Sequence, residues 1–199
     1  METQTHSQPQ PLAAKHAQCP ALPGGDLWVF GYGSLMWDPG FPFVECTPAL
    51  LRGYHRSFCI WSARYRGTPE RPGLVLGLAR GGACRGIAFR VAGPAVAEVI
   101  ALLWAREMSR LTYRPRMVRL AAGASSVQAL TFVADPRHPS YAGRMTDEEV
   151  ARRIACCTGA RGPNLDYLAN TLRHLEALGV RDAHVARIYR AVQELGASQ

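Results

Sequence analysis

The chain has 199 residues, 48% of them hydrophobic, which suits one domain with a substantial core. No apolar run reaches the roughly 18 to 20 residues of a membrane-spanning helix, and no basic-then-apolar signal opens the chain, so we expect a cytoplasmic protein without a membrane partner. The formal net charge is +8, but the basic residues are scattered arginines apart from Lys15. This pattern indicates a solvated surface that favours a small anionic substrate, and no nucleic-acid partner is expected.

The six cysteines form no C-x-x-C pair, and none lies at the usual spacing of zinc ligands from a histidine. We therefore expect reduced thiols, no metal site and no thiol catalysis. The histidines show no metal-ligand spacing either.

Residues 1–25 lack a periodic apolar pattern and are predicted to be a disordered tail before a single domain over residues 26–199. Strands are predicted, in chain order, over residues 27–30, 50–62, 73–79, 84–91, 114–120 and 125–134. A helix is predicted from Pro94 to Met108, and three more over residues 146–157, 163–179 and 182–195. Thr146 and Glu149 form a predicted capping box, and Gly179 a predicted C-cap. Because the strands come first and the helices later, the class is α+β.

The stretch "LWVFGYGSLMWDPG", residues 27–40, ends an apolar strand in a glycine loop. A dinucleotide fingerprint would need glycine at Met36, a nucleophile elbow would also need glycine at Tyr32, and a P-loop would need a lysine. What remains is a loop with the Ser34 hydroxyl and backbone N–H groups, which can bind a carboxylate or an oxyanion. The alternative is a purely structural turn.

Glu107 lies in the apolar stripe of the first predicted helix. At 100° per residue it falls about 20° from Ile100, whereas Glu98 falls on the opposite face. A carboxylate directed at a core near a helix C-terminus should have a raised proton affinity, which is how a general base is tuned. Alternatively, the helix frays before Glu107, or Glu107 pairs with Arg110 or Arg114.

Two tyrosines and one loop are weaker candidates for a site. Tyr141 in "HPSYAG" and Tyr167 in "NLDYL" are either hydroxyl donors in a pocket or amphipathic residues at the edge of the core. The loop "RGTPE" either closes over a site or only connects two strands.

Five motifs in order resemble the ChaC family of γ-glutamylcyclotransferases: "VFGYGSLMW", "RGTPERPG", "LWAREM" with "TYRP", "YAG" and "GPNLDYL". The resemblance covers about residues 26–195. It implies the γ-glutamylcyclotransferase-like fold, a small closed mixed β-barrel with flanking helices, and no metal or organic cofactor. It also implies an enzyme that acts on glutathione and releases 5-oxoproline and cysteinylglycine.

The resemblance also implies roles for particular residues. The loop residues Tyr32, Gly33, Ser34 and Leu35 bind the γ-glutamyl portion, and Glu107 is the general acid/base, the residue that helical periodicity marks independently. Tyr141 and Tyr167 match positions that belong to the family's site.

Two other functions remain open from the sequence. One is a cyclotransferase for other γ-glutamyl amino acids or amines. The other is a non-catalytic binding module on the same scaffold, such as an arginine-rich RNA binder, for which the presence of Glu107 is unfavourable. The oligomeric state is not indicated.

Overall fold

The computed structural model describes residues 19–197, and its centre is a closed barrel of five strands in the order β1-β3-β2-β4-β5. Neighbouring strands are antiparallel except β1 and β5, which pair in parallel and close the barrel. The strands are β1 Leu27–Gly31, β2 Glu45–Ser62, β3 Gly73–Val91, β4 Tyr113–Ala122 and β5 Ser125–Ala134. The predicted α+β class with a closed mixed barrel is confirmed.

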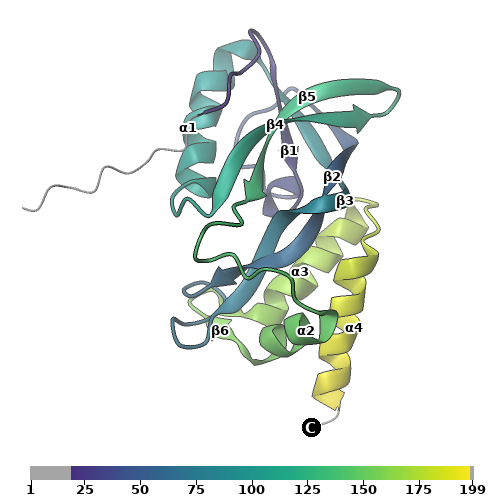
Figure 1. Cartoon of the computed structure of the whole chain (residues 1–199). Coiled ribbons are helices and arrows are strands. Elements are labelled where there is room, and N and C mark those ends of the chain that lie inside the picture. The colour runs from purple at the N-terminus through teal and green to yellow at the C-terminus, as the bar shows by residue number, and fades with distance from the viewer. Residues whose placement is uncertain (1–18, 198–199) are drawn as a thin grey trace, which may run out of the picture.

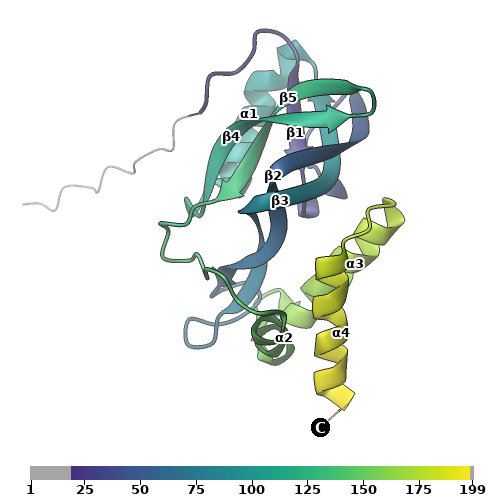
Figure 2. The ribbon, with the colours of Figure 1, turned by 45° about the vertical axis from the view of Figure 1, so that its right-hand side comes forward.

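The helices form two groups around this barrel. Figure 1 shows α1 against the upper part of the barrel, whereas α2, α3 and α4 lie together near its lower end, and Figure 2 shows the long β2–β3 ribbon reaching towards them. The helices are α1 Val96–Glu107, α2 Asp147–Cys156, α3 Asn164–Ala177 and α4 Ala183–Ala197. Shorter elements are the 3-10 turns η1 Ser34–Met36 and η2 Gly93–Ala95 and the strand pair β6 Thr158–Gly159 and β7 Gly162–Pro163. Within residues 19–197, no helix is long and apolar enough to span a membrane.

The two strands predicted over residues 73–79 and 84–91 are one continuous strand, β3, so that prediction was wrong. The ladder with β2 continues across the gap, with Tyr54 opposite Arg80 and Arg52 opposite Ala83. Gly53, Gly81 and Gly82 have positive φ angles at this point. These glycines form an irregularity that bends the ribbon without ending it.

The start of α1 also differs from the prediction. Pro94 lies in the 3-10 turn η2, and the α-helix begins two residues later at Val96. At α2 the predicted capping box is confirmed. The Thr146 hydroxyl accepts the Glu149 N–H at 3.2 Å, and the Glu149 carboxylate accepts the Thr146 N–H at 2.7 Å.

The apolar faces of α3 and α4 follow the helical periodicity, although Leu172 and Leu195 on those faces are only partly buried. Leu168 and Leu175 of α3 and Val185, Ile188 and Val192 of α4 belong to the same core cluster as barrel residues. Helix α3 ends at Ala177, and Gly179 two residues later has a φ angle of +67°, as expected for the predicted C-cap. Of the predicted tail, residues 1–18 lie outside the described residues, and residues 19–25 form no helix or strand.

Candidate active site

A cavity of about 50 Å³ lies where the loop after β1 meets the end of α1. Strands β3, β4 and β5 and helix α3 each contribute one side chain. The lining residues are Tyr32, Gly33, Ser34, Leu35, Leu76, Glu107, Tyr113, Phe132 and Tyr167. The fold therefore brings Glu107, the predicted loop residues and Tyr167 to one place, although they lie far apart in the sequence.

The glycine loop reverses direction directly after β1. The 3-10 turn is closed by the Met36 N–H, which donates to the Gly33 carbonyl at 2.8 Å, and by the Asp38 N–H, which donates to the Ser34 carbonyl at 2.9 Å. A Cβ atom on Gly31 would come within 3.1 Å of the Leu35 Cβ atom. A larger residue at position 31 would therefore push against the turn where it folds back onto the strand end. The first N–H groups of such a turn have no carbonyl acceptor inside it, so they are available to a ligand.

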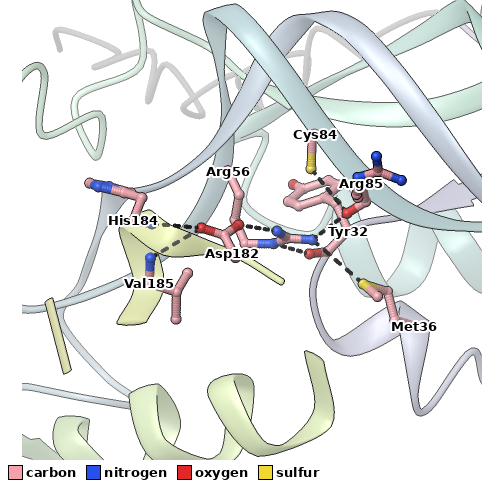
Figure 3. Close-up of polar contacts among 8 residues, drawn as sticks. All are labelled: Tyr32, Met36, Arg56, Cys84, Arg85, Asp182, His184 and Val185. Atoms are coloured by element: carbon pink, nitrogen blue, oxygen red, sulfur yellow. Dashed lines mark hydrogen bonds and ion pairs between the residues drawn. The ribbon is translucent and has the colours of Figure 1, made fainter. Parts of the chain in front are cut away.

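The buried Arg56 contacts the start of this loop (Figure 3). Its Nε atom donates to the Tyr32 carbonyl at 2.6 Å, and one Nη atom donates to the Arg85 carbonyl at 2.8 Å. Its other Nη atom forms an ion pair with Asp182, which accepts the N–H of Val185 at the start of α4. Arg56 therefore ties the loop to both the barrel and the C-terminal helices.

Glu107 is the last residue of α1, and its side chain is only 17% exposed. Burial raises the pKa of its carboxyl group above the usual 4.5, and the guanidinium of Arg106 counteracts part of this rise. The Arg106 Nε atom lies 3.3 Å from Glu107 Oε1. The predicted increase in proton affinity is confirmed in direction, with burial as its cause. Of the arginines considered as partners from the sequence, Arg114 instead pairs with Asp135 at 2.7 Å.

Ser34 is held by the same arginine as Glu107. An Nη atom of Arg106 donates to Ser34 Oγ at 2.9 Å, and its other Nη atom donates to the Asp38 carbonyl at 2.7 Å. Because Ser34 Oγ accepts from Arg106, its own O–H proton can be donated to a ligand in the cavity. Arg106 thus sets the distance between the loop and the carboxylate.

Three phenols line the cavity near Glu107. Burial raises the pKa values of Tyr32 and Tyr113 well above 10.0 and that of Tyr167 to about 12, and the neighbouring Glu107 carboxylate adds to each rise. All three are therefore neutral hydrogen-bond donors at physiological pH. Tyr113 donates to the Leu76 carbonyl at 2.8 Å, whereas Tyr167 accepts the Leu76 N–H at 3.4 Å and keeps its own proton for a ligand.

Tyr141 lies apart from this group. It forms an isolated β-bridge with Ile60 and lines a separate cavity of about 340 Å³. Sequence reasoning also left Tyr113 and Arg56 out of the candidate residues. The position of Tyr113 six residues after Glu107, within the quoted motif "TYRP", is the signal that could have found it.

A larger cleft of about 600 Å³ adjoins the small cavity and shares Ser34, Glu107 and Tyr113 with it. This volume falls in the range of small-molecule sites. Its rim carries guanidinium groups, among them Arg110 and Arg161. In residues 19–197, no group of three His, Cys, Asp or Glu side chains is placed to hold a metal ion.

The barrel with its flanking helices is the fold of γ-glutamylcyclotransferases. A crystal structure of a γ-glutamylcyclotransferase specific to glutathione from yeast superposes with a TM-score of 0.77 at 20% identity. The match covers 85% of this chain and 96% of that one. At this identity the likeness shows the fold alone, so the predicted fold is confirmed.

Sequence comparison gives the family. The family model described as ChaC-like protein matches residues 27–195. The chain is 37% identical over 172 residues to the glutathione-specific γ-glutamylcyclotransferase of Escherichia coli, covering 86% of this chain and 74% of that protein. It is 33% identical over 205 residues to glutathione-specific γ-glutamylcyclotransferase 1 of Rattus norvegicus, covering 98% of this chain and 92% of that protein. The chain belongs to the ChaC family.

Proposed function

We propose that this protein is a glutathione-specific γ-glutamylcyclotransferase. The α-amino nitrogen of glutathione attacks its own γ-carbonyl carbon, and the bond from that carbon to the cysteinyl nitrogen breaks. The products are 5-oxoproline and cysteinylglycine. The observation that carries the proposal is that Glu107 faces the same small cavity as the loop Tyr32–Leu35, in a chain related to enzymes named for this activity.

Glu107 is the general acid/base in this proposal. An α-amino group has a pKa near 8, so at pH 7 it is mostly the ammonium form, which is not nucleophilic. Glu107 accepts a proton from this group and passes one to the departing cysteinyl nitrogen, a contribution of about 10² to 10⁴-fold. Burial raises the pKa of the Glu107 carboxyl group towards that of the substrate α-ammonium group, which lowers the free-energy cost of the proton transfer.

The loop and the phenols supply binding and charge stabilisation. Nucleophile and electrophile belong to one molecule, so the enzyme must hold it folded, and the rigid loop Tyr32–Leu35 supplies that proximity. The Ser34 hydroxyl and the loop N–H groups face the α-carboxylate of the substrate. The Tyr167 hydroxyl, free to donate, stabilises the negative charge that develops on the γ-carbonyl oxygen.

The test is to incubate the protein with glutathione and to measure 5-oxoproline and cysteinylglycine by mass spectrometry. The variant Glu107→Gln keeps the shape of the side chain and removes the base, so we expect near-total loss of turnover. Glu98→Gln is the matched control, because Glu98 is an exposed carboxylate on the same helix. Full activity of Glu107→Gln would overturn the proposed role of Glu107. No turnover of glutathione by the parent would overturn the proposed enzymatic activity.

We also propose a cytoplasmic location. All six cysteines fall within the described residues and are free thiols, including the adjacent pair Cys156 and Cys157 with sulfur atoms 3.8 Å apart. Free thiols are typical of a reducing compartment, where glutathione is also kept reduced. Fractionation of the cells that make the protein tests this location.

A further inference from the structure

Three arginine side chains converge on the ring of Tyr65 at the rim of the large cleft. The guanidinium carbons of Arg161, Arg110 and Arg64 lie 4.5, 5.2 and 5.5 Å from the ring centroid. These distances are within the range of cation–π contacts. The three residues come from segments far apart in the sequence, so the fold gathers the charges.

These guanidinium groups have no acidic partner in the part of the chain that the structure describes. Among residues 19–197, no carboxylate forms an ion pair with Arg64, Arg110 or Arg161, whereas Arg106 in the same cleft pairs with Glu107. A guanidinium offers a planar fork of donors that matches a carboxylate. The cluster is therefore a positively charged surface to which an anion can bind.

Backbone hydrogen bonds hold Tyr65, the platform on which the three guanidinium groups lie. The N–H of Arg161 donates to the Tyr65 carbonyl at 2.9 Å, and the N–H of Ala160 donates to the Arg64 carbonyl at 2.8 Å. One Nη atom of Arg66 also donates to the Arg161 carbonyl at 2.7 Å. Since none of these bonds uses the side chains of Arg110 or Arg161, those side chains can be replaced without breaking the platform.

Arg110 and Arg161 line the same cleft as Glu107 and Ser34. When the γ-glutamyl group of glutathione occupies the small cavity, the cysteinylglycine portion must extend into this cleft. That portion ends in the glycyl carboxylate, the only negative charge of glutathione outside the γ-glutamyl group. We infer that Arg110 and Arg161, held over Tyr65, bind the glycyl carboxylate of glutathione and select it among γ-glutamyl compounds.

This inference rests on the proposed function and adds a specificity site to it. The test compares glutathione with its glycyl monoethyl ester, which keeps the reacting atoms and lacks this charge. For the parent we expect a KM for the ester about 10- to 100-fold above that for glutathione, from the loss of a charge-assisted contact. The values of kcat should agree within about threefold, because the contact persists unchanged through the reaction.

The double variant Arg110→Gln/Arg161→Gln should bind both compounds alike. Its KM for glutathione should rise about 10- to 100-fold, and the ratio of the two KM values should fall below about threefold. The control is Arg116→Gln/Arg119→Gln, which removes the same charge from exposed positions of β4 outside the cleft and should keep the parent's ratio.

Three outcomes separate the two proposals. A double variant that keeps both the parent's KM and its preference for glutathione overturns the carboxylate site and leaves the cyclotransferase intact. An equal loss of preference in the Arg116→Gln/Arg119→Gln control shows long-range charge attraction and also overturns the site. A parent that turns over neither compound overturns both proposals.

Discussion

Arg56 and Asp182 form a buried ion pair that joins the barrel to the start of α4. The Arg56 side chain is 1% exposed and that of Asp182 15%. The same guanidinium donates to the carbonyl of Tyr32, the first residue of the glycine loop (Figure 3). The position of the loop therefore depends on the packing of a helix that lies outside the cavity.

Replacing Arg56 with methionine should destabilise the protein and impair the loop. Asp182 would remain a mostly buried charge without its partner, which costs about 3–5 kcal/mol of unfolding free energy. Urea unfolding measures this loss. The control Arg90→Met removes a partly exposed arginine paired with Asp26 and Glu45 and should cost much less. Equal losses in the two variants would contradict the buried pair's importance.

A second substitution separates stability from loop position. In Arg56→Met/Asp182→Asn, the asparagine is neutral and still offers an oxygen to the N–H of Val185, so part of the lost stability should return. The Tyr32 carbonyl still lacks its donor, so glutathione turnover should stay low. Recovery of turnover together with stability would show that Arg56 acts on the fold and not on the loop.

Glu107→Gln should change how stability depends on pH. In the unfolded chain the carboxyl group ionises near its usual pKa of 4.5, whereas burial raises the pKa in the folded protein. Between the two values the folded state binds more protons, so the group's contribution to stability falls as pH rises and stays low above the raised pKa. Glutamine does not titrate.

The melting temperature of Glu107→Gln relative to the parent should therefore rise between about pH 4 and about pH 7. Thermal unfolding of both proteins at the two pH values measures this difference. A relative melting temperature that falls over this interval would mean that the ion pair with Arg106, 3.3 Å away, outweighs burial. The Glu107 carboxylate would then be a weaker proton acceptor than the proposed mechanism requires.

The two phenols that contact Leu76 should respond differently to phenylalanine. Tyr113→Phe leaves the Leu76 carbonyl without its donor at 2.8 Å, which should cost about 1–3 kcal/mol of unfolding free energy. Tyr167→Phe loses only a long contact of 3.4 Å, so its stability should change little. Its kcat should fall about 10²-fold if the hydroxyl stabilises the oxyanion. The reverse order of effects would exchange the roles of the two residues.

Local patterns were sufficient for some features of the site and insufficient for others. Glu107 stands out because helical periodicity places a carboxylate in an apolar stripe, and the structure contains a mostly buried carboxylate next to the glycine loop. The barrel strands follow from apolar runs, but Gly81 and Gly82, usual signs of a chain reversal, only bend β3. Whether two glycines bend a strand or end it depends on its pairing with the neighbouring strand, here β2. A local sequence pattern does not indicate that pairing.

The residues that sequence reasoning missed act through contacts between distant segments. Arg56 resembles any charged residue of a strand in "GYHRSF", and its partners are the carbonyls of Tyr32 and Arg85 and the side chain of Asp182. The arginines around Tyr65 resemble scattered surface charge for the same reason. Such groups become visible only when the fold brings their elements together.

Gly31→Ala tests whether the sharp reversal after β1 forms the site. The added methyl group would come 3.1 Å from the Leu35 Cβ atom and 3.2 Å from the Met36 backbone nitrogen, closer than ordinary contacts. The turn must move, which should cost about 1–3 kcal/mol of unfolding free energy and shift Ser34 away from the substrate. Gly24→Ala, with no atom within 4 Å of the new methyl group, is the control. We expect KM for glutathione to rise in Gly31→Ala and not in Gly24→Ala, and an unchanged KM in both would show that the loop tolerates displacement and does not bind the γ-glutamyl group.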